Sequence, residues 1–509
     1  MTPSERLAPY VTNLNRPVYA IHGLPPEVVA VLFALVSRSP AGFRENLLTL
    51  MEEDRLPITS PRDEGAGFDQ SRASAFHEKW VLGYGHSSVA EHATLHFALE
   101  GLSILAAKAV EDARLAAFTE KSSRYQVFDL DHFHWPAEWA GDPDEGAARA
   151  LVAELFAAYG RVYQELKVEL GQAERPAGLS QRAWQQTLHA AACDAARYLL
   201  PAGARTSLGM TINARGAAHL ARKLRCHELA EVRELGDRLE EEGRLVTPVL
   251  LKHSQPGDWQ RGLRGRLAAA LPRDGSERDE GSVPRVRLVD WDRDAEERIV
   301  ADWLVQARGC GLEQARRHAA ALGERRGDLL RRALDGLGEH EALPRAFEQV
   351  MLTVEFCLDY GAFRDLQRHR LLTPTVPALG CRWGWELPEA LEFPARRAAI
   401  EALLERVARL WKRLATRHEA AASYLVPLAF RQRFVVRMNL REAAHLIHLR
   451  SAPAGHLSYR SAAQDLHRQL VAAWPLLGAL LRVNRDGAAW AREKELRRGE
   501  ISLGEGRSS

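Results

Sequence analysis

Apolar and polar positions follow strand and helix periods in the same order at two distant places in the chain. Residues 18–21 predict a short strand, and Pro25-Pro26-Glu27 then opens an apolar-periodic helix that continues to about residue 37, since proline is tolerated in the first turn. Residues 286–289 predict another short strand, and a second periodic helix starts after Asp294. A strand and a helix that recur in the same order indicate internal duplication.

A longer pattern also occurs twice, once in each half of the chain. In both halves a predicted helix ends before a proline, an extended segment follows, and a further helix begins at an Asn-x-Arg sequence. The predicted ranges are 182–200, 204–212 and 214–239 in the first half, and 406–424, 430–438 and 439–450 in the second. Asn213 follows Arg197 by 16 positions (213 − 197), and Asn439 follows Ser423 by the same 16 (439 − 423). This matched spacing predicts two copies of one α+β unit.

The chain also contains a stretch that has too little periodic apolar content to fold alone. Residues 255–284 are rich in charge, proline and glycine, apart from an apolar run at residues 267–271. A length of 509 residues leaves room for two large domains. We therefore expect a first domain at residues 1–254, a linker at residues 255–284 and a second domain at residues 285–509.

Composition narrows the classes of partner. The 69 Lys and Arg residues against 67 Asp and Glu residues give a formal charge of +2, which is no broad basic field for nucleic acid. An anion would have to meet a local arginine cluster. The five cysteines show no C-x-x-C pairing, so neither disulfides nor structural zinc are expected. The first residues do not have the pattern of an export signal, and no run of 18 apolar residues occurs, so we expect a cytoplasmic protein that does not bind membranes.

Three short stretches concentrate side chains that a plain core element does not need. Residues 86–92 read His-Ser-Ser-Val-Ala-Glu-His, residues 119–125 read Thr-Glu-Lys-Ser-Ser-Arg-Tyr, and residues 368–370 read Arg-His-Arg. Guanidinium groups pair bidentately with phosphate, so the arginine triplet is a candidate anion site. The plain alternative is a solvated basic face of a helix, which composition alone favours.

The histidines at the start of this region have a plain alternative as well. His92 and His96 would pack in the core beside Phe97. A Glu-His-x-x-x-His string also suggests a metal, but no third ligand follows at a recognisable spacing. No metal is expected.

These motifs resemble the flavin-dependent thymidylate synthases, whose signature is R-H-R-x-x-S-x-N-E-x-S-x-R-Y preceded by H-x-S-x-x-E-H. The first half matches the upstream motif and the end of the signature at His86, Ser88, Glu91, His92, Glu120, Ser122, Arg124 and Tyr125. Where the family has R-H-R, the first half reads Asp-Ala-Arg at residues 112–114. The second half carries the intact triplet but has lost the rest of the signature. The resemblance extends over about residues 17–253 and 285–484, and implies two tandem copies of a fold with a small antiparallel sheet and packed helices.

The resemblance also implies roles for individual residues. Cofactor binding falls to His86, Ser88, Glu91, Asn213, Arg215, Arg368, His369, Arg370, Asn439 and Arg441. Contacts to the substrate fall to Glu120, Ser122, Arg124 and Arg197, and the arginines near the reacting ring are Arg225 and Arg450. For Ser122, Arg124 and Arg197 the alternative is an ordinary ion-pair network around Glu100, Glu111 and Glu120, which would contribute little at a surface.

The activity implied by the resemblance is the methylation of dUMP to dTMP. In that family FAD is the cofactor, methylenetetrahydrofolate supplies the methylene group, and no protein nucleophile is needed. The intact triplet lies in one half and the phosphate-contact residues in the other, so a site here would be composite. Family members are tetramers, and a tandem chain would accordingly form a homodimer. The alternatives are a catalytically inactive flavin- or nucleotide-binding scaffold and a different flavin or nucleotide enzyme on the same fold.

Overall fold

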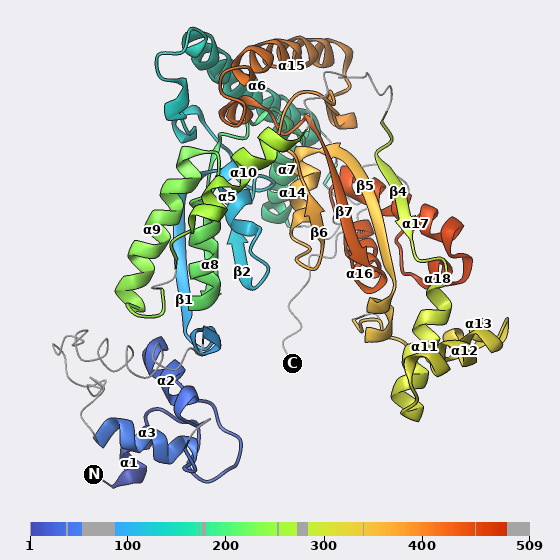
Figure 1. Ribbon diagram of the computed structural model, residues 1–509. Coiled ribbons are helices and arrows are strands. Elements are labelled where there is room, and N and C mark those ends of the chain that lie inside the picture. Colours follow the sequence, from blue (N-terminus) through green and yellow to red (C-terminus); the bar gives the residue numbers. More distant parts are fainter. Residues whose placement is uncertain are drawn as a thin grey trace. The chain divides into compact units, whose positions relative to one another are not determined.

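The computed structural model (Figure 1) describes residues 2–36, 39–52, 87–172, 174–175, 180–251, 254–271, 283–338, 340–453 and 455–485. Contacts divide the chain into two compact units. Unit 1 comprises Met1–Leu102, Ala109–Glu120 and Ser207–Gly275, and unit 2 comprises Ser103–Lys108, Lys121–Thr206 and Ser276–Ser509. Unit 2 therefore contains segments of both sequence copies. The domain boundaries expected at residues 254 and 285 describe the copies in the sequence and stay a prediction.

Unit 1 is built on a three-stranded sheet in the order β1-β3-β2. Its strands are β1 (Thr94–Ser103), β2 (Ala116–Glu120) and β3 (Arg205–Asn213). β2 runs antiparallel to β3, with Phe118 opposite Met210. Alternate residues of β3 are buried, which is the pattern of a sheet with one packed face. The helices are α1 (Pro3–Leu7), α2 (Pro26–Val36), α3 (Phe43–Glu52), α8 (Ala214–Leu224), α9 (Ala230–Val246) and α10 (Asp258–Ala270), and a 3₁₀ turn, η2 (Ser87–Glu91), precedes β1. The last three residues of α5 (Ile104–Glu111) belong to unit 1 and the rest to unit 2.

Unit 2 is built on a four-stranded antiparallel sheet in the order β4-β5-β7-β6 (Figure 1). The strands are β4 (Val286–Trp291), β5 (Met351–Asp359), β6 (Thr373–Thr375) and β7 (Arg431–Asn439). β5 and β7 pair along their whole length, and the rings of Phe356 and Phe434 stack across them with centroids 5.3 Å apart. Such cross-strand aromatic pairs stabilise a sheet and fix its register.

Helices and 3₁₀ turns complete unit 2. Those of the first copy are η3 (Leu130–His132), η4 (Ala137–Trp139), α6 (Glu145–Gly171), α7 (Gln181–Ala196) and η5 (Arg197–Leu199). Those of the second are α11 (Ala295–Arg308), α12 (Leu312–Ala321), α13 (Arg325–Ala333), η6 (Arg345–Gln349), α14 (Tyr360–Gln367), η7 (Glu389–Leu391), α15 (Pro394–Ala415), η8 (Ala421–Leu425), α16 (Leu440–Ser451), α17 (Leu457–Ala473) and α18 (Pro475–Leu480).

Equivalent segments of the two copies pair with each other inside unit 2. Pro201 and Pro427 form an antiparallel bridge, flanked by hydrogen bonds of 2.9 Å from Ala202 N to Val426 O and from Leu428 N to Leu200 O. The prolines are 226 positions apart (427 − 201), the same offset as between Asn213 and Asn439 (439 − 213). Equivalent residues of the two copies therefore face each other across a local two-fold axis, as in an isologous dimer interface.

A second contact between the copies is made by two long helices that lie side by side, α6 and α15 (Figure 1). Arg406 on α15 binds Glu154 on α6 at 2.7 Å, and Arg396 binds both Glu165 and Glu169. The Arg406–Glu154 pair is exposed, and a pair of this kind contributes little by itself. The charges of these pairs are segregated, however, with the acids on the first copy and the arginines on the second.

The two Asn-x-Arg corners fold alike. Asn213 ends β3 and its Oδ1 accepts a 2.7 Å hydrogen bond from the Gly216 N–H, and Asn439 ends β7 and accepts one of 2.8 Å from the Glu442 N–H. Each asparagine is thus the N-cap of the following helix, which is a favoured role for this residue. The prediction of a repeated strand-to-helix corner is confirmed.

Several predicted elements differ in extent. The strand expected at residues 18–21 is wrong, since Ile21 makes only an isolated bridge to Val11. The helix α10 fills much of the expected linker, well beyond the apolar run at residues 267–271, while residues 272–282 lie outside the described part. The helix predicted at 214–239 is two helices, α8 and α9. The expected strand at residue 286 and the helix after Asp294 are confirmed as β4 and α11.

Gly203 tests the pairing of the copies. A Cβ at this position would overlap the Phe133 ring and lie 3.1 Å from the Tyr424 carbonyl oxygen. We expect Gly203→Ala to lower the free energy of unfolding by about 1–3 kcal/mol, because overpacking strains the contact. Gly209→Ala is the matched control, because the added methyl would meet only Thr119 O at 3.8 Å. Equal thermal midpoints for the two variants would show that the contact yields without cost.

Candidate functional site

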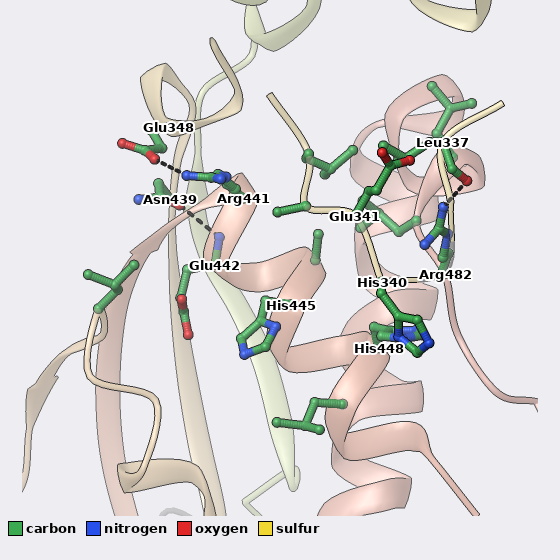
Figure 2. Close-up of a pocket in the computed structure, with 17 residues that line it drawn as sticks. Leu337, His340, Glu341, Glu348, Asn439, Arg441, Glu442, His445, His448 and Arg482 are labelled. Atoms are coloured by element: carbon green, nitrogen blue, oxygen red, sulfur yellow. Dashed lines mark hydrogen bonds and ion pairs between the residues drawn. The ribbon is translucent and has the colours of Figure 1, made fainter. Parts of the chain in front are cut away.

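A pocket of about 560 Å³ opens in unit 2 beside the Asn-x-Arg corner of the second copy (Figure 2). One wall is α16, which contributes Arg441, Glu442, His445 and His448. The facing walls come from the segments around His340 and around Arg482, and leucines fill the spaces between the polar groups. A cavity of this size with apolar walls and a few convergent polar groups is typical of a small-molecule site.

The predicted cofactor residues Asn439 and Arg441 both line this pocket. The Arg441 Nη1 donates to Glu348 Oε1 at 2.6 Å, so its guanidinium is held by a carboxylate at the rim (Figure 2). Hydrogen bonding and the charge of Arg441 lower the pKa of Glu348 from its usual value. The pair keeps a cation in place beside the cavity.

The arginine triplet divides into two exposed residues and one buried residue. Arg368 and Arg370 are exposed, whereas His369 is only 5 % exposed. His369 Nδ1 lies 2.9 Å from Glu442 Oε1, and the Arg450 Nε donates to His369 Nε2 at 2.9 Å. The histidine thus joins the pocket residue Glu442 to Arg450, the arginine expected near the reacting ring.

The predicted phosphate-contact residues Arg124 and Arg197 lie in unit 2 as well. Arg124 makes two hydrogen bonds to Asp194, of 2.6 Å from Nε and 2.9 Å from Nη2. Arg197 is 4 % exposed, its Nη2 is 3.9 Å from Asp365 Oδ2, and its Nε and Nη2 have no hydrogen-bond partner among the described residues. Ser122 accepts a 3.2 Å hydrogen bond from the Arg124 N–H and orders the turn that carries it.

Tyr459 on α17 connects the two groups of residues. Arg124 Nη1 donates to the Tyr459 hydroxyl at 3.4 Å, and the Arg450 guanidinium lies over the Tyr459 ring, 5.4 Å from its centroid. A continuous chain of contacts therefore runs from Asp194 of the first copy to Glu442 of the second. The structure brings together residues that are more than 300 positions apart in the sequence.

Buried titratable groups surround this chain of contacts. Burial opposes ionisation of Asp194, yet the hydrogen bonds and charge of Arg124 hold the pKa of that carboxyl below its usual value. Burial raises the pKa of Asp359, which accepts hydrogen bonds from Ser458 Oγ and the Ala362 N–H. Complete burial lowers the pKa of His456 well below its ordinary value, and the nearby Arg197 acts in the same direction. The region is a low-dielectric environment in which charges act strongly.

The other predicted site residues belong to unit 1 and are held by local partners. Arg215 pairs with Glu91 at 2.5 Å. Arg225 is 8 % exposed and binds Glu240 at 2.5 Å, Asp237 at 2.6 Å and the Ser254 carbonyl at 3.0 Å. Ser88 lies exposed in η2, Glu120 ends β2, and His86 lies outside the described residues.

The alternative of core packing beside Phe97 is wrong for His92 and His96, since both side chains are exposed. His92 stacks edge-on against Phe33, with centroids 4.7 Å apart, and His96 Nδ1 lies 2.9 Å from Thr211 Oγ1. Within the described ranges no three His, Cys, Asp or Glu side chains are arranged to hold a metal ion. Among the same residues, no helix is both long and apolar enough to cross a membrane.

Sequence reasoning missed the partners that complete these contacts. Asp194 precedes Arg197 by one helical turn and Glu442 follows Asn439 by one, so helical spacing could have found both. His445 and Tyr459 gave no signal, because their places depend on which distant segments pack together.

The model of the family described as thymidylate synthase complementing protein matches residues 25–249 and 287–476. The chain belongs to this family. The two separate matches fit a tandem duplication of the family unit, and the two sheets with their helices form an α+β fold in two copies.

Proteins similar to this chain include UPF0159 proteins and flavin-dependent thymidylate synthases. A UPF0159 protein from Chlamydia pneumoniae is 30 % identical over 92 % of both chains, and one from Chlamydia muridarum is 29 % identical over 94 % of both. A flavin-dependent thymidylate synthase from Clostridium tetani is 26 % identical over 45 % of this chain and 83 % of its own. The structure of a flavin-dependent thymidylate synthase from Helicobacter pylori, complexed with FAD and dUMP, aligns with 39 % of this chain at 14 % identity and a TM-score of 0.30.

Asp194 decides how firmly Arg124 is held. We expect Asp194→Asn to lower the free energy of unfolding by about 3–5 kcal/mol, because it leaves a buried guanidinium without this carboxylate. Glu313→Gln, in an exposed pair with Arg317, is the control and should change stability by less than about 0.5 kcal/mol. The contribution of Asp194 should be present above about pH 4 and should be lost as the pH falls, because its folded pKa is depressed. A stable Asp194→Asn variant in chemical denaturation would contradict this account.

Proposed function

We propose that this protein binds FAD and dUMP in the cytoplasm and methylates dUMP to dTMP with methylenetetrahydrofolate and reduced flavin. Membership of the thymidylate synthase complementing protein family and the relatives named as flavin-dependent thymidylate synthases support the proposal. The observation that carries it is the chain of contacts from Arg124 of the first copy through Tyr459 to Arg450 of the second. It favours one composite site over two separate ones.

The residues present suit an anionic nucleotide. Arg197 is buried, two of its nitrogens have no hydrogen-bond partner among the described residues, and its charge acts on Asp194, the partner of Arg124. A phosphate would offer these donors the acceptor oxygens they lack. Glu120 remains a proposed substrate contact, and Arg225 remains proposed, with Arg450, as an arginine near the reacting ring.

The pocket beside α16 suits part of a flavin. Its leucines offer flat apolar walls for a ring, while Arg441 and Asn439 offer polar groups at the edge. Bound reduced flavin would supply the hydride that completes the methyl group. The protein would bind and orient both ligands and exclude water, with Arg450 near the reacting ring. Cofactor contacts are proposed for Arg368 and Arg370 of the second copy and for His86, Ser88, Glu91, Asn213 and Arg215 of the first.

A binding scaffold without turnover is the second candidate. The observation that favours it is the carboxylate partner of each predicted substrate arginine, since Asp194 binds Arg124 and Asp365 lies near Arg197. A dianionic phosphate would have to compete with these carboxylates. Such a protein would bind a flavin or a nucleotide and yield no dTMP when supplied with a reductant and folate.

Ligand titration of arginine variants tests the composite site. We expect Arg124→Ala and Arg370→Ala each to weaken binding of FAD or dUMP by about 2 kcal/mol or more, measured by calorimetry, because each removes a charge that pairs with phosphate. The double variant should add little beyond either single change, since the residues act as a unit.

The exposed residue Arg317, whose side chain is 67 % exposed, supplies the control variant Arg317→Ala, which should bind both ligands as wild type does. Losses that add independently would sink the composite site. An Arg370→Ala protein that unfolds more easily but binds both ligands normally would also contradict the composite site, and would favour the binding scaffold without turnover.

Assembly gives a separate prediction. A chain with two family units needs one partner to reach the four units of a tetramer, so we expect a homodimer. Light scattering at micromolar concentration should give twice the 56.8 kDa mass of the chain. A strict monomer under those conditions would contradict the prediction.

A further inference from the structure

His369 occupies an unusual position for the central residue of an arginine triplet. Its side chain is buried and lies between a carboxylate and a guanidinium, with Glu442 Oε1 2.9 Å from Nδ1 and Arg450 Nε 2.9 Å from Nε2. Both ring nitrogens are therefore engaged by protein groups. Neither is left for a ligand, which separates His369 from its exposed neighbours Arg368 and Arg370.

The two contacts determine which nitrogen carries the proton. An arginine Nε–H can only donate, so His369 Nε2 must accept and cannot be protonated. The proton then resides on Nδ1, which donates to Glu442. A doubly protonated imidazolium would break the contact with Arg450, so the geometry requires a neutral ring.

The surroundings of the ring agree with a neutral state. Burial lowers the pKa of His369, and the charge of Arg450 and the nearby His445 act in the same direction, while Glu442 opposes them. The His445 ring lies edge-on at 5.3 Å. These are the charged and titratable groups that act on His369 from α16.

We propose that His369 is a positioning residue: Glu442 holds the imidazole in place, and the imidazole in turn holds the Arg450 side chain. We call this pair of contacts the relay. The Glu442 N–H is itself capped by Asn439, so the relay starts from the rigid strand-to-helix corner. Among the described residues the Arg450 side chain makes no other hydrogen bond than the one from Nε, and it lies over the Tyr459 ring. Its two terminal nitrogens are thereby held ready for an anionic ligand atom. This role rests on the proposed function, in which Arg450 contacts the nucleotide or the flavin.

Two amide substitutions separate the two halves of the relay. In His369→Gln the Oε1 can replace Nε2 as acceptor for Arg450, whereas in His369→Asn the amide nitrogen can replace Nδ1 as donor to Glu442 only. We expect His369→Gln to bind FAD and dUMP nearly as wild type does. His369→Asn should lose about 10-fold or more in affinity for one of them, matching Arg450→Ala.

A purely structural histidine would respond differently. Each variant would then lose affinity in proportion to the drop in its thermal midpoint relative to wild type. At a temperature where both variants are folded, their affinities would be equal. That result, or an Asn variant that binds as tightly as the Gln variant, would overturn the proposal.

The tautomer can be read without any ligand. In protein labelled with ¹⁵N-histidine, with His369→Gln used to assign the resonance, His369 should show a proton on Nδ1 and none on Nε2. The Arg450 Nε–H should be protected from exchange with solvent in wild type and His369→Gln, and exposed in His369→Asn. A protonated Nε2 would refute the relay. If neither FAD nor dUMP binds to wild type while the tautomer is as expected, the proposed function fails and the positioning of Arg450 stands.

Discussion

The antiparallel contact between residues 198–203 and 424–429 is the constraint on which unit 2 depends. It joins equivalent segments of the two copies by backbone hydrogen bonds, and residues within it, such as Leu199, Leu425 and Val426, are completely buried. The 3₁₀ turns η5 and η8 lie at this contact, and the side chains that they carry are buried. Arg197, the first residue of η5, is buried as well.

A buried arginine needs carboxylates or other hydrogen-bond acceptors beside it. Asp194 accompanies Arg124, Asp365 lies near Arg197, and Arg285 binds Glu386 at 2.9 Å. Removing charges from water costs several kcal/mol per ion, so such groups persist only with good partners or with a reason to be present. The network of unit 2 supplies the partners. The reason we propose is that a phosphate competes for the same donors.

Local patterns in the sequence were informative wherever local geometry decides the outcome. The equal spacing of 16 residues located both strand-to-helix corners, and the asparagines there proved to be helix N-caps. The triplet at residues 368–370 was located too, but nothing in its spacing shows that His369 turns inward to Arg450, since that depends on α16 packing against the end of α14. The false strand at residues 18–21 shows the opposite error, in which a short apolar run has strand propensity but its pairing is limited to one bridge, between Ile21 and Val11.

The interleaving of the copies within unit 2 could not be read from periodicity either. Hydrophobic patterns report which face of an element is buried and leave open which distant segment covers it. Asp194 and Tyr459 hold Arg124 only because their segments pack against it. Both residues contact Arg124, from sequence positions on opposite sides of the predicted linker.

The opposed charges of α6 and α15 require the two copies to differ in sequence, which a tandem chain permits. In a symmetric dimer of identical chains both helices would carry the same residues, and a helix rich in glutamate would face another of its kind. Here Glu154 and Glu165 on one copy face Arg406 and Arg396 on the other. Covalent linkage fixes the pair at one to one and prevents exchange with like partners, so each surface was released to specialise for the other. At this contact neither α6 nor α15 carries the charges that would attract a second copy of itself.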